Sequence, residues 1–346
     1  MSTPSPAAHM PPIAARAALP VTVIGGYLGA GKTTLVNHLL RERGGRRLAI
    51  LVNDFGDIAI DQDLIESTDG PVQRLAGGCI CCSFGSDLVG ALLAMPAMEP
   101  RPDHILIETS GVAIPGMVAQ AVRLVQGLVL DAVLVLADAS TLRARAGDAY
   151  VGDTVQRQLR DADLVLLNKI DLVDPPELER LCEWLQALTP RARVVPVQQA
   201  RLATALVLDA GGAAGVRTQA PADAPGMLLT GGRLQPPPPS AQQLFDSISM
   251  EFEGPVDCQK LAAAFGNPQA DLVRAKGLMT DNDGTARALQ LVGTRCTVVP
   301  SSHPHPESGR LVCIALKGRL DRAWVAQVLA DAGARQLRAR DAGDAA

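Results

Sequence analysis

Three cysteines fall within four residues of the chain, in the run Gly77-Gly78-Cys79-Ile80-Cys81-Cys82. Thiolates packed this closely suit a borderline-soft transition metal such as Zn²⁺ far better than they suit Mg²⁺ or Ca²⁺. Adjacent cysteines do not ligate one ion equally well. We therefore expect two of the thiolates among Cys79, Cys81 and Cys82 to bind the metal, with Asp54 or water as a further ligand.

The residues after the cysteines predict an amphipathic helix, because Leu88, Ala91, Leu92 and Met95 repeat at i, i+3, i+4 and i+7. Thiols just before a helix N-terminus have a lowered pKa, which favours the metal-binding thiolate. A thiol–disulfide switch and a buried structural cluster are the other interpretations of these cysteines. The remaining cysteines are isolated and are most simply small core hydrophobes: Cys182, Cys258, Cys296 and Cys313.

A phosphate-binding loop precedes the cysteines. The β-branched run Val21–Ile24 is followed by Gly26-Tyr27-Leu28-Gly29-Ala30-Gly31-Lys32-Thr33, which matches G-x-x-x-x-G-K-[ST] between a strand and a helical pattern. Backbone N–H groups of such a loop turn onto phosphates, and the helix N-terminus adds partial positive charge. Lys32 would reach the β- and γ-phosphates, and the Thr33 hydroxyl would ligate Mg²⁺. The residues expected to bind phosphate are Gly26, Gly29, Ala30, Gly31, Lys32, Thr33 and Thr34.

A second nucleotide-site segment is Ile105-Leu106-Ile107-Glu108-Thr109-Ser110-Gly111, an apolar strand that ends in an acidic residue with a glycine shortly after it. Glu108 is placed to hold Mg²⁺ through water, and the Gly111 N–H would sense the γ-phosphate; an ordinary strand-end carboxylate is the alternative. Such contacts order a loop in the triphosphate state and release it after hydrolysis. Lys32 and Glu108 are the candidate catalytic residues.

A guanine-recognition element follows another predicted strand. Asn168-Lys169-Ile170-Asp171 comes at the C-terminal end of the run Asp163-Leu164-Val165-Leu166-Leu167, which is expected to be a buried strand, and open α/β sheets bind their ligands at such ends. A carboxylate at Asp171 can accept from the ring N–H and the exocyclic amine of guanine, a pair of donors that adenine lacks. The motif alone could equally mark a helix start, but its place downstream of the phosphate loop favours GTP over ATP. Asn168, Lys169 and Asp171 are therefore expected to bind GTP.

Together these residues resemble the CobW family of P-loop GTPases, a branch of the metallochaperone GTPases related to the hydrogenase and urease maturation factors. The resemblance covers about residues 20–200 and is carried by Gly25–Leu35, Val52–Asp57, Gly78–Cys82, Glu108–Gly111 and Asn168–Asp171. It implies a GTPase that binds Zn²⁺ or Co²⁺ at the Cys-x-Cys-Cys motif and transfers the ion to a client protein. The candidate metal ligands are Cys79, Cys81, Cys82 and Asp54.

The chain departs from the family pattern at two places. Asp54 and Asp57 stand in the first switch, where members commonly carry Glu, so the carboxylates differ in reach. Segment 112–126 contains no histidine, and His303 and His305 in a Pro-rich stretch indicate either a solvated loop or an auxiliary metal site. Storage of several metal ions is not expected, and the sequence does not assign a fourth ligand.

Composition is typical of a soluble intracellular protein. The 346 residues are 47% apolar, enough for a sizeable core. An odd number of cysteines, 7, opposes a secreted disulfide framework and fits a reducing cytosol. The net charge of −4 gives no footprint for nucleic-acid binding. No apolar run approaches the length of a transmembrane helix, so we expect a cytoplasmic protein without nucleic-acid or membrane partners.

The order of elements predicts an α/β domain with a mainly parallel sheet and helices on both faces. Strands are expected at 21–24, 48–52, 72–75, 104–108, 132–137, 164–167 and 194–197. The predicted layout is a disordered leader (1–18), a P-loop GTPase domain (19–208), a Gly/Pro-rich linker (209–240), a C-terminal α+β domain (241–338) and a tail (339–346).

The second region predicts a small α+β domain with an antiparallel sheet. Strands are expected at 247–252, 272–279, 288–299 and 310–316, and helices at 258–265 and 321–337. Lys276-Gly277-Leu278 and the strand after Ala288 resemble the CobW C-terminal domain. Periodicity alone predicts no catalytic constellation in this region.

These observations predict a GTP-dependent metallochaperone that binds GTP, Mg²⁺ and either Zn²⁺ or Co²⁺. The sequence identifies no arginine finger or water-orienting glutamine, so intrinsic hydrolysis should be slow. One rival is a regulatory GTPase with redox-sensing thiols and a partner-binding C-terminal domain, and another is a P-loop kinase or ATPase unrelated to metals. Thiolate ligation favours Zn²⁺ without excluding Co²⁺, and neither the client nor the oligomeric state is predicted.

Overall fold

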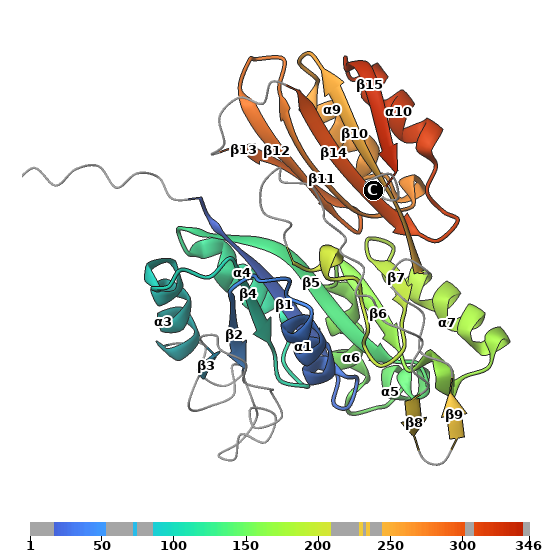
Figure 1. The fold of residues 1–346 in the computed structure, drawn as a ribbon. Helices are drawn as coiled ribbons and strands as arrows, with labels where there is room; N and C mark the ends of the chain where they lie inside the picture. The colour runs from blue at the N-terminus through green and yellow to red at the C-terminus, as the bar shows by residue number, and fades with distance from the viewer. Residues whose placement is uncertain are drawn as a thin grey trace, which may run out of the picture.

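The computed structural model describes residues 17–52, 72–74, 86–208, 228–230, 233–235, 244–301 and 308–341. Figure 1 shows two sheets, each with its own helices, and the C-terminal sheet in orange and red lies above the N-terminal one.

The N-terminal sheet is parallel and has seven strands in the order β3-β2-β4-β1-β5-β6-β7. They are β1 (Leu19–Gly26), β2 (Leu48–Val52), β3 (Val72–Arg74), β4 (His104–Glu108), β5 (Leu128–Asp138), β6 (Leu164–Asn168) and β7 (Arg193–Pro196). Every residue of β2, β4 and β6 is buried. Strands covered on both faces are continuous apolar runs, which is why the sequence predicts them well. The expected parallel α/β sheet is confirmed.

Helices cover both faces of this sheet. On one face α1 (Lys32–Arg41), which lies in front of the sheet in Figure 1, packs through Leu35, Val36 and Leu39. The other face is covered by α3 (Ser86–Ala94), α4 (Pro115–Leu124), α5 (Leu142–Ala146), α6 (Gly152–Arg160) and α7 (Pro175–Leu188). The amphipathic helix predicted after the cysteines is α3. Short 3₁₀ turns are η1 (Met95–Ala97), η2 (Ile170–Leu172) and η3 (Thr204–Leu206).

The C-terminal sheet is antiparallel and has six strands in the order β13-β12-β11-β14-β10-β15. They are β10 (Phe245–Glu253), β11 (Leu272–Thr280), β12 (Ala286–Val292), β13 (Arg295–Pro300), β14 (Gly309–Leu316) and β15 (Arg335–Asp341). The helices α9 (Cys258–Phe265) and α10 (Arg322–Asp331) pack on this sheet through Leu261, Phe265, Val325 and Leu329, and η4 (Pro268–Ala270) precedes β11. The expected antiparallel α+β architecture is confirmed.

The isolated cysteines are core residues, as the sequence predicts. Cys258 and Cys313 are buried in the C-terminal core, and Cys296 packs against it. Cys182 packs against the core of the parallel sheet. Burial raises the pKa of the Cys296 thiol to about 12, so this cysteine stays protonated.

Two predicted elements of the C-terminal region are wrong. The single strand expected at 288–299 is two strands, because Gly293 turns the chain with φ 61 between β12 and β13. The helix expected at 321–337 begins as predicted, where Asp321 accepts from the Trp324 N–H, but ends at Asp331. Gly333, with φ 108, terminates it, and the chain continues as β15.

The turn between β12 and β13 docks the C-terminal sheet onto the parallel sheet. A Cβ on Gly293 would lie 2.2 Å from the Asp163 carbonyl oxygen, so only glycine fits there. The Thr294 hydroxyl donates to the Arg191 carbonyl at 2.7 Å. Arg295 donates to both carboxylate oxygens of Asp163, at 2.8 and 2.7 Å.

A second interdomain contact is a buried ion pair. Nη2 of Arg274 on β11 donates to Asp131 Oδ1 and Oδ2 on β5 at 2.8 and 2.6 Å, and the two residues are 1% and 2% exposed. Burial acts to raise the pKa of Asp131, but the charges of Arg274, Lys276 and His104 outweigh it and hold the pKa well below its usual range. The apolar core is also shared, because Phe245, Val273 and Val292 cluster with α1 and the segment 202–208.

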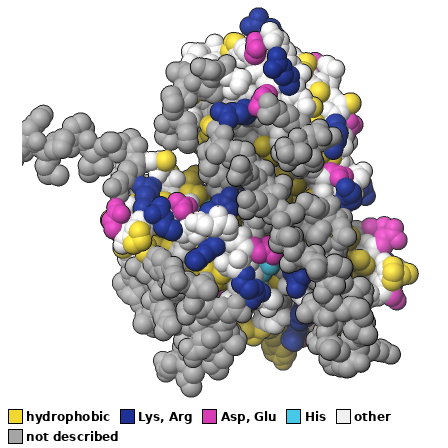
Figure 2. Space-filling view, in the orientation of Figure 1, with side chains coloured by type: hydrophobic (Ala, Val, Ile, Leu, Met, Phe, Trp, Pro, Cys, Tyr) yellow, Lys and Arg dark blue, Asp and Glu magenta, His cyan; other side chains and the backbone are white. Residues whose placement is uncertain are grey.

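Within the stretch predicted as a linker, β8 (Leu228–Thr230) and β9 (Arg233–Gln235) pair as a short antiparallel ladder. The helices among the described residues are too short or too polar to span a lipid bilayer. On the face shown in Figure 2, basic and acidic side chains of the described residues are interspersed.

Candidate nucleotide site

The phosphate loop joins β1 to α1 through a backbone that favours glycine. Gly26, Gly29 and Gly31 have φ angles of 131, 76 and 106°, which L side chains rarely adopt. A Cβ on Gly26 would lie 2.2 Å from the Leu136 carbonyl oxygen, so the start of the loop presses on β5. Helix α1 begins at Lys32, and its first N–H groups, which have no partner within the helix, adjoin the loop.

Lys32 and Thr33 lie where the chemistry needs them. Lys32 is 7% exposed, and its ammonium donates to the Gly26 carbonyl at 3.0 Å, so it lies against the loop. Thr33 Oγ1 donates to Glu108 Oε1 at 2.8 Å, across 75 residues of sequence. The structure thus brings together the two predicted Mg²⁺ ligands, whose hydroxyl and carboxylate oxygens are hard donors that suit this ion.

The segment after β4 contacts the same loop. The Thr109 N–H donates to the Ile24 carbonyl of β1 at 2.9 Å. A Cβ on Gly111 would lie 2.9 Å from the backbone nitrogen of Leu28, which shows how closely this predicted γ-phosphate sensor approaches the loop. Ser110 is 5% exposed, and its Oγ has no hydrogen-bond partner in the described part of the chain.

Asn168 braces two loops from the end of β6. Its Nδ2 donates to the Ala30 carbonyl at 2.9 Å, and its Oδ1 accepts from the Ala200 N–H at 2.9 Å. Asn168 is 2% exposed. Ala200 and the preceding Gln199 have positive φ angles of 52 and 51°, so the loop after β7 turns sharply at this contact. One amide therefore fixes the phosphate loop relative to the segment after β7.

Lys169 and Asp171 flank the brace. Lys169, at φ 61, extends its ammonium to Asp138 Oδ2 at 2.6 Å. Burial acts to raise the pKa of Asp138, but hydrogen bonds from Lys169 and Ser140 outweigh it and lower the pKa below its usual value. Asp171 lies in η2 and is exposed, so its carboxylate is accessible to a base.

The predicted transition-metal ligands lie outside the described residues. These are Cys79, Cys81, Cys82 and Asp54, and the same holds for His303 and His305. Among the residues that the structure does describe, no group of three or more His, Cys, Asp or Glu side chains could hold a metal ion.

The arrangement of loop, strand-end carboxylate and bracing amide agrees with the family models that match the sequence. The model for the CobW/HypB/UreG nucleotide-binding domain matches residues 20–196. The chain belongs to the CobW/HypB/UreG family. The model for the cobalamin synthesis protein cobW C-terminal domain matches residues 245–333, which hold the antiparallel sheet through β14 and both its helices.

This CobW-family chain is similar to proteins that are named as zinc chaperones. The zinc chaperone CobW of a Sinorhizobium species is 31% identical over 222 residues, which cover 56% of this chain and 63% of that protein. The zinc chaperone YjiA of Escherichia coli K12 is 34% identical over 200 residues, covering 56% and 61%. The matched region therefore spans less than two thirds of the length of these relatives.

Among solved structures, the zinc-bound YjiA GTPase of E. coli aligns with 91% of this CobW-family chain and 99% of its own. The identity is 23% and the TM-score 0.41, a likeness too low to decide the fold by itself.

The sequence prediction missed three residues of the site in this CobW-family chain. Asp138 binds Lys169, the Ala200 N–H binds Asn168, and Gln158 of α6 donates to the carbonyls of Gly111 and Ala113. No motif marks any of them. A polar residue in an amphipathic helix, at a position that periodicity would turn inward, is the one signal that could have singled out Gln158.

Proposed function

We propose that this chain is a GTP-dependent metallochaperone, which binds Zn²⁺ or Co²⁺ at Cys79, Cys81 and Cys82 and hydrolyses GTP to control transfer of the ion to a client protein. Membership of the CobW/HypB/UreG family supports the nucleotide part. The metal part is supported by the run of thiols and by the names of the zinc chaperone relatives.

The observation that carries the nucleotide part is the hydrogen bond from Thr33 to Glu108. It joins the first turn of α1 to the end of β4 at 2.8 Å. An oxygen pair of this kind fits Mg²⁺, and the buried Ser110 Oγ nearby in sequence is a further oxygen without a partner among the described residues. When bound, Mg²⁺ would neutralise charge on the β- and γ-phosphates.

The residues of the chain would divide the remaining work. The Lys32 ammonium would exchange the Gly26 carbonyl for phosphate oxygens, and the glycine backbone and the start of α1 would donate N–H groups to the β-phosphate. The Gly111 N–H would donate to the γ-phosphate, which GDP lacks. Asp171 would accept from guanine, and Asn168 would keep the two loops in register.

The metal step would rest on the cysteine motif and Asp54. Thiolates favour Zn²⁺, and cobalt stays an alternative within the proposal. Loss of the γ-phosphate would release the Gly111 segment. We propose that this movement changes the geometry of the cysteine ligands and lowers their affinity for the metal ion, so that transfer to the client runs in one direction.

The test is zinc affinity measured by chelator competition with GTP, with GDP and without nucleotide. We expect the affinity to differ between GTP and GDP by at least about tenfold, which is about 1.4 kcal/mol. The double variant Cys81→Ser/Cys82→Ser should lose both the affinity and this dependence. Lys32→Ala should lose the dependence alone, and Cys182→Ser, which removes an isolated thiol of the core, should behave as wild type.

A zinc affinity that is equal in GTP and GDP, or that survives replacement of both cysteines, would overturn the proposal. Competition between ATP and GTP tests the alternative of a P-loop kinase or ATPase, because such a protein would bind ATP at least as well as GTP.

A further inference from the structure

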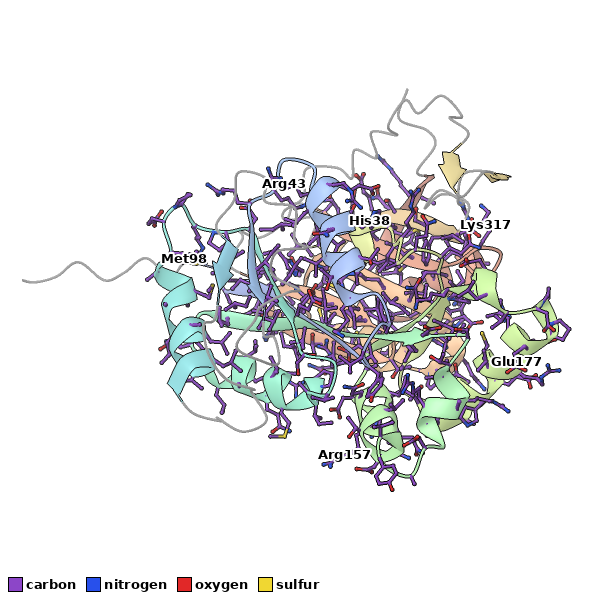
Figure 3. All side chains as sticks on the ribbon, turned by 90° about the horizontal axis from the view of Figure 1, so that it is seen from below. His38, Arg43, Met98, Arg157, Glu177 and Lys317 are labelled. Atoms are coloured by element: carbon purple, nitrogen blue, oxygen red, sulfur yellow. The ribbon has the colours of Figure 1, made fainter. Side chains whose placement is uncertain are left out.

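The side-chain amide of Gln158 is turned into the protein towards the segment that follows β4. Its nitrogen donates to the Gly111 carbonyl at 3.0 Å and to the Ala113 carbonyl at 2.8 Å, and the residue is 1% exposed. Both partners are carbonyls, which only accept, so a flipped amide would lose both bonds. The preceding Arg157, labelled in Figure 3, points away from the body of the molecule and pairs with Asp153 on the surface.

The end of α6 adds another anchor to the same segment. Asp161 accepts from the Gly116 N–H at 3.0 Å, in the first turn of α4. A Cβ on Gly116 would lie 2.4 Å from that carboxylate. The backbone from Gly111 to Gly116 is thus held from α6 at three points.

The phosphate loop lies against the opposite side of Gly111. The backbone nitrogen of Leu28 would be 2.9 Å from a Cβ on Gly111, so this glycine sits between the loop and the Gln158 amide. The bond to the Gly111 carbonyl fixes the peptide that follows it. The Gly111 N–H belongs to the preceding peptide and follows the same Cα, so a displacement of the segment that would carry this N–H away from the loop has to break the bond.

We propose that Gln158 is a positioning residue for recognition of the γ-phosphate: its amide fixes the Gly111–Ala113 backbone so that the Gly111 N–H meets GTP. The inference rests on the proposed function and adds what sets the preference for GTP over GDP. Because GDP has no γ-phosphate, its affinity does not depend on this bond.

The test compares Kd values for GTP and GDP, with Mg²⁺, on the full chain by isothermal titration calorimetry. Gln158→Met keeps the length of the side chain without a donor, and Gln158→Glu turns a carboxylate onto two carbonyls. The matched control is Gln156→Met, because Gln156 on the same helix donates to the Ala146 carbonyl at 2.9 Å and does not bond the segment.

We expect Gln158→Met to raise the Kd for GTP about tenfold, which is about 1.4 kcal/mol, and to leave the Kd for GDP unchanged within about twofold. Gln158→Glu should weaken GTP further and also lower kcat for hydrolysis, whereas Gln156→Met should change neither affinity. A merely structural role would weaken both nucleotides by the same factor, and that result overturns the inference.

An unchanged ratio of the two affinities overturns it as well. Should Gln158→Met not fold, Gln158→Asn keeps the amide on an arm too short to reach both carbonyls, with the same loss of ratio expected. A wild-type chain that binds neither nucleotide refutes the proposed function. If wild type and Gln158→Met prefer GTP over GDP by the same factor, this inference alone is refuted.

Discussion

The two sheets of this chain are built on different plans. In the parallel sheet every residue of β2, β4 and β6 is buried, whereas β14 of the antiparallel sheet alternates buried with exposed or half-buried residues. The side chains proposed for nucleotide chemistry come where parallel strands end: Thr33 after β1, Glu108 on β4 and Asn168 on β6. The antiparallel sheet instead contacts the parallel sheet through Arg274 on β11 and through the turn between β12 and β13.

The difference shows which surfaces each sheet can offer. The loops that follow parallel strands all begin at the same edge of the sheet, the carboxyl-terminal one, so the side chains of a ligand site lie together at that edge. The C-terminal sheet docks at the other ends, on Asp131 near the start of β5, Asp163 before β6 and Arg193 at the start of β7. The chain therefore keeps nucleotide binding and domain docking at opposite ends of the same strands.

The largest expected effect comes from breaking the docking ion pair. Arg274→Met removes both hydrogen bonds from the buried Asp131 carboxylate and leaves it facing Lys276, whose Nζ is 3.7 Å from Oδ1. The variant should lower the free energy of unfolding by about 3 kcal/mol, the lower end of the range for a broken buried pair. Chemical denaturation measures it. Adding Asp131→Leu should recover most of the loss, because apolar residues replace buried pairs at little cost. Arg319→Met, which breaks an exposed pair with Asp271, should cost less than about 1 kcal/mol. Equal losses for the two arginines would contradict the docking role.

A matched pair of core truncations compares the sheets directly. Leu166→Ala in β6 and Leu289→Ala in β12 each remove a side chain that is 0% exposed, and each should lower the free energy of unfolding by about 2–5 kcal/mol. Because Phe245, Val273 and Val292 join the core of the parallel sheet, both variants should still unfold in one transition. Fluorescence and circular dichroism followed together would show it. A separate early transition in Leu289→Ala would mean that the antiparallel sheet is independent.

Acid should weaken the docking contact. The pKa of Asp131 in the folded chain lies below the unfolded value of about 3.9, so its contribution to stability is complete above that pH. The contribution is lost as the pH falls below about 4 towards the folded pKa. Between pH 7 and pH 3 the free energy of unfolding of wild type should therefore fall by about 1–2 kcal/mol more than that of Arg274→Met/Asp131→Leu. Chemical denaturation at the two pH values measures it. Parallel losses would sink this prediction.

The smallest expected effect concerns the loops at the nucleotide edge. Gly111→Ala places a Cβ 2.9 Å from the Leu28 nitrogen, so the two segments must move apart. The variant should weaken GTP binding by about 1–2 kcal/mol and lower the free energy of unfolding by a similar amount. Titration with GTP measures the affinity. Gly90→Ala, where nothing lies within 4 Å, is the control and should leave affinity unchanged. An unaltered GTP affinity in Gly111→Ala would separate Gly111 from the γ-phosphate.

The parallel sheet could be predicted from sequence because its strands are uninterrupted apolar runs and its loops carry motifs. The antiparallel sheet was harder, since alternation continues through Gly293 and hides the turn that docks on Asp163. Gly333 likewise ended a helix that periodicity extended. Gln158, Asp138 and Ala200 act through contacts between distant segments, which no local pattern encodes. The metal ligands stay a prediction from sequence, outside the described residues.

Asn168 touches the phosphate loop with one end of its amide and the segment after β7 with the other. Tightening the phosphate loop around a ligand therefore also steadies the segment after β7, through an amide that lies three residues before Asp171. Guanosine alone and pyrophosphate alone should each bind far more weakly than the intact nucleotide. Guanosine would contact only the side of Asp171 and pyrophosphate only the phosphate loop, so neither fragment steadies both regions.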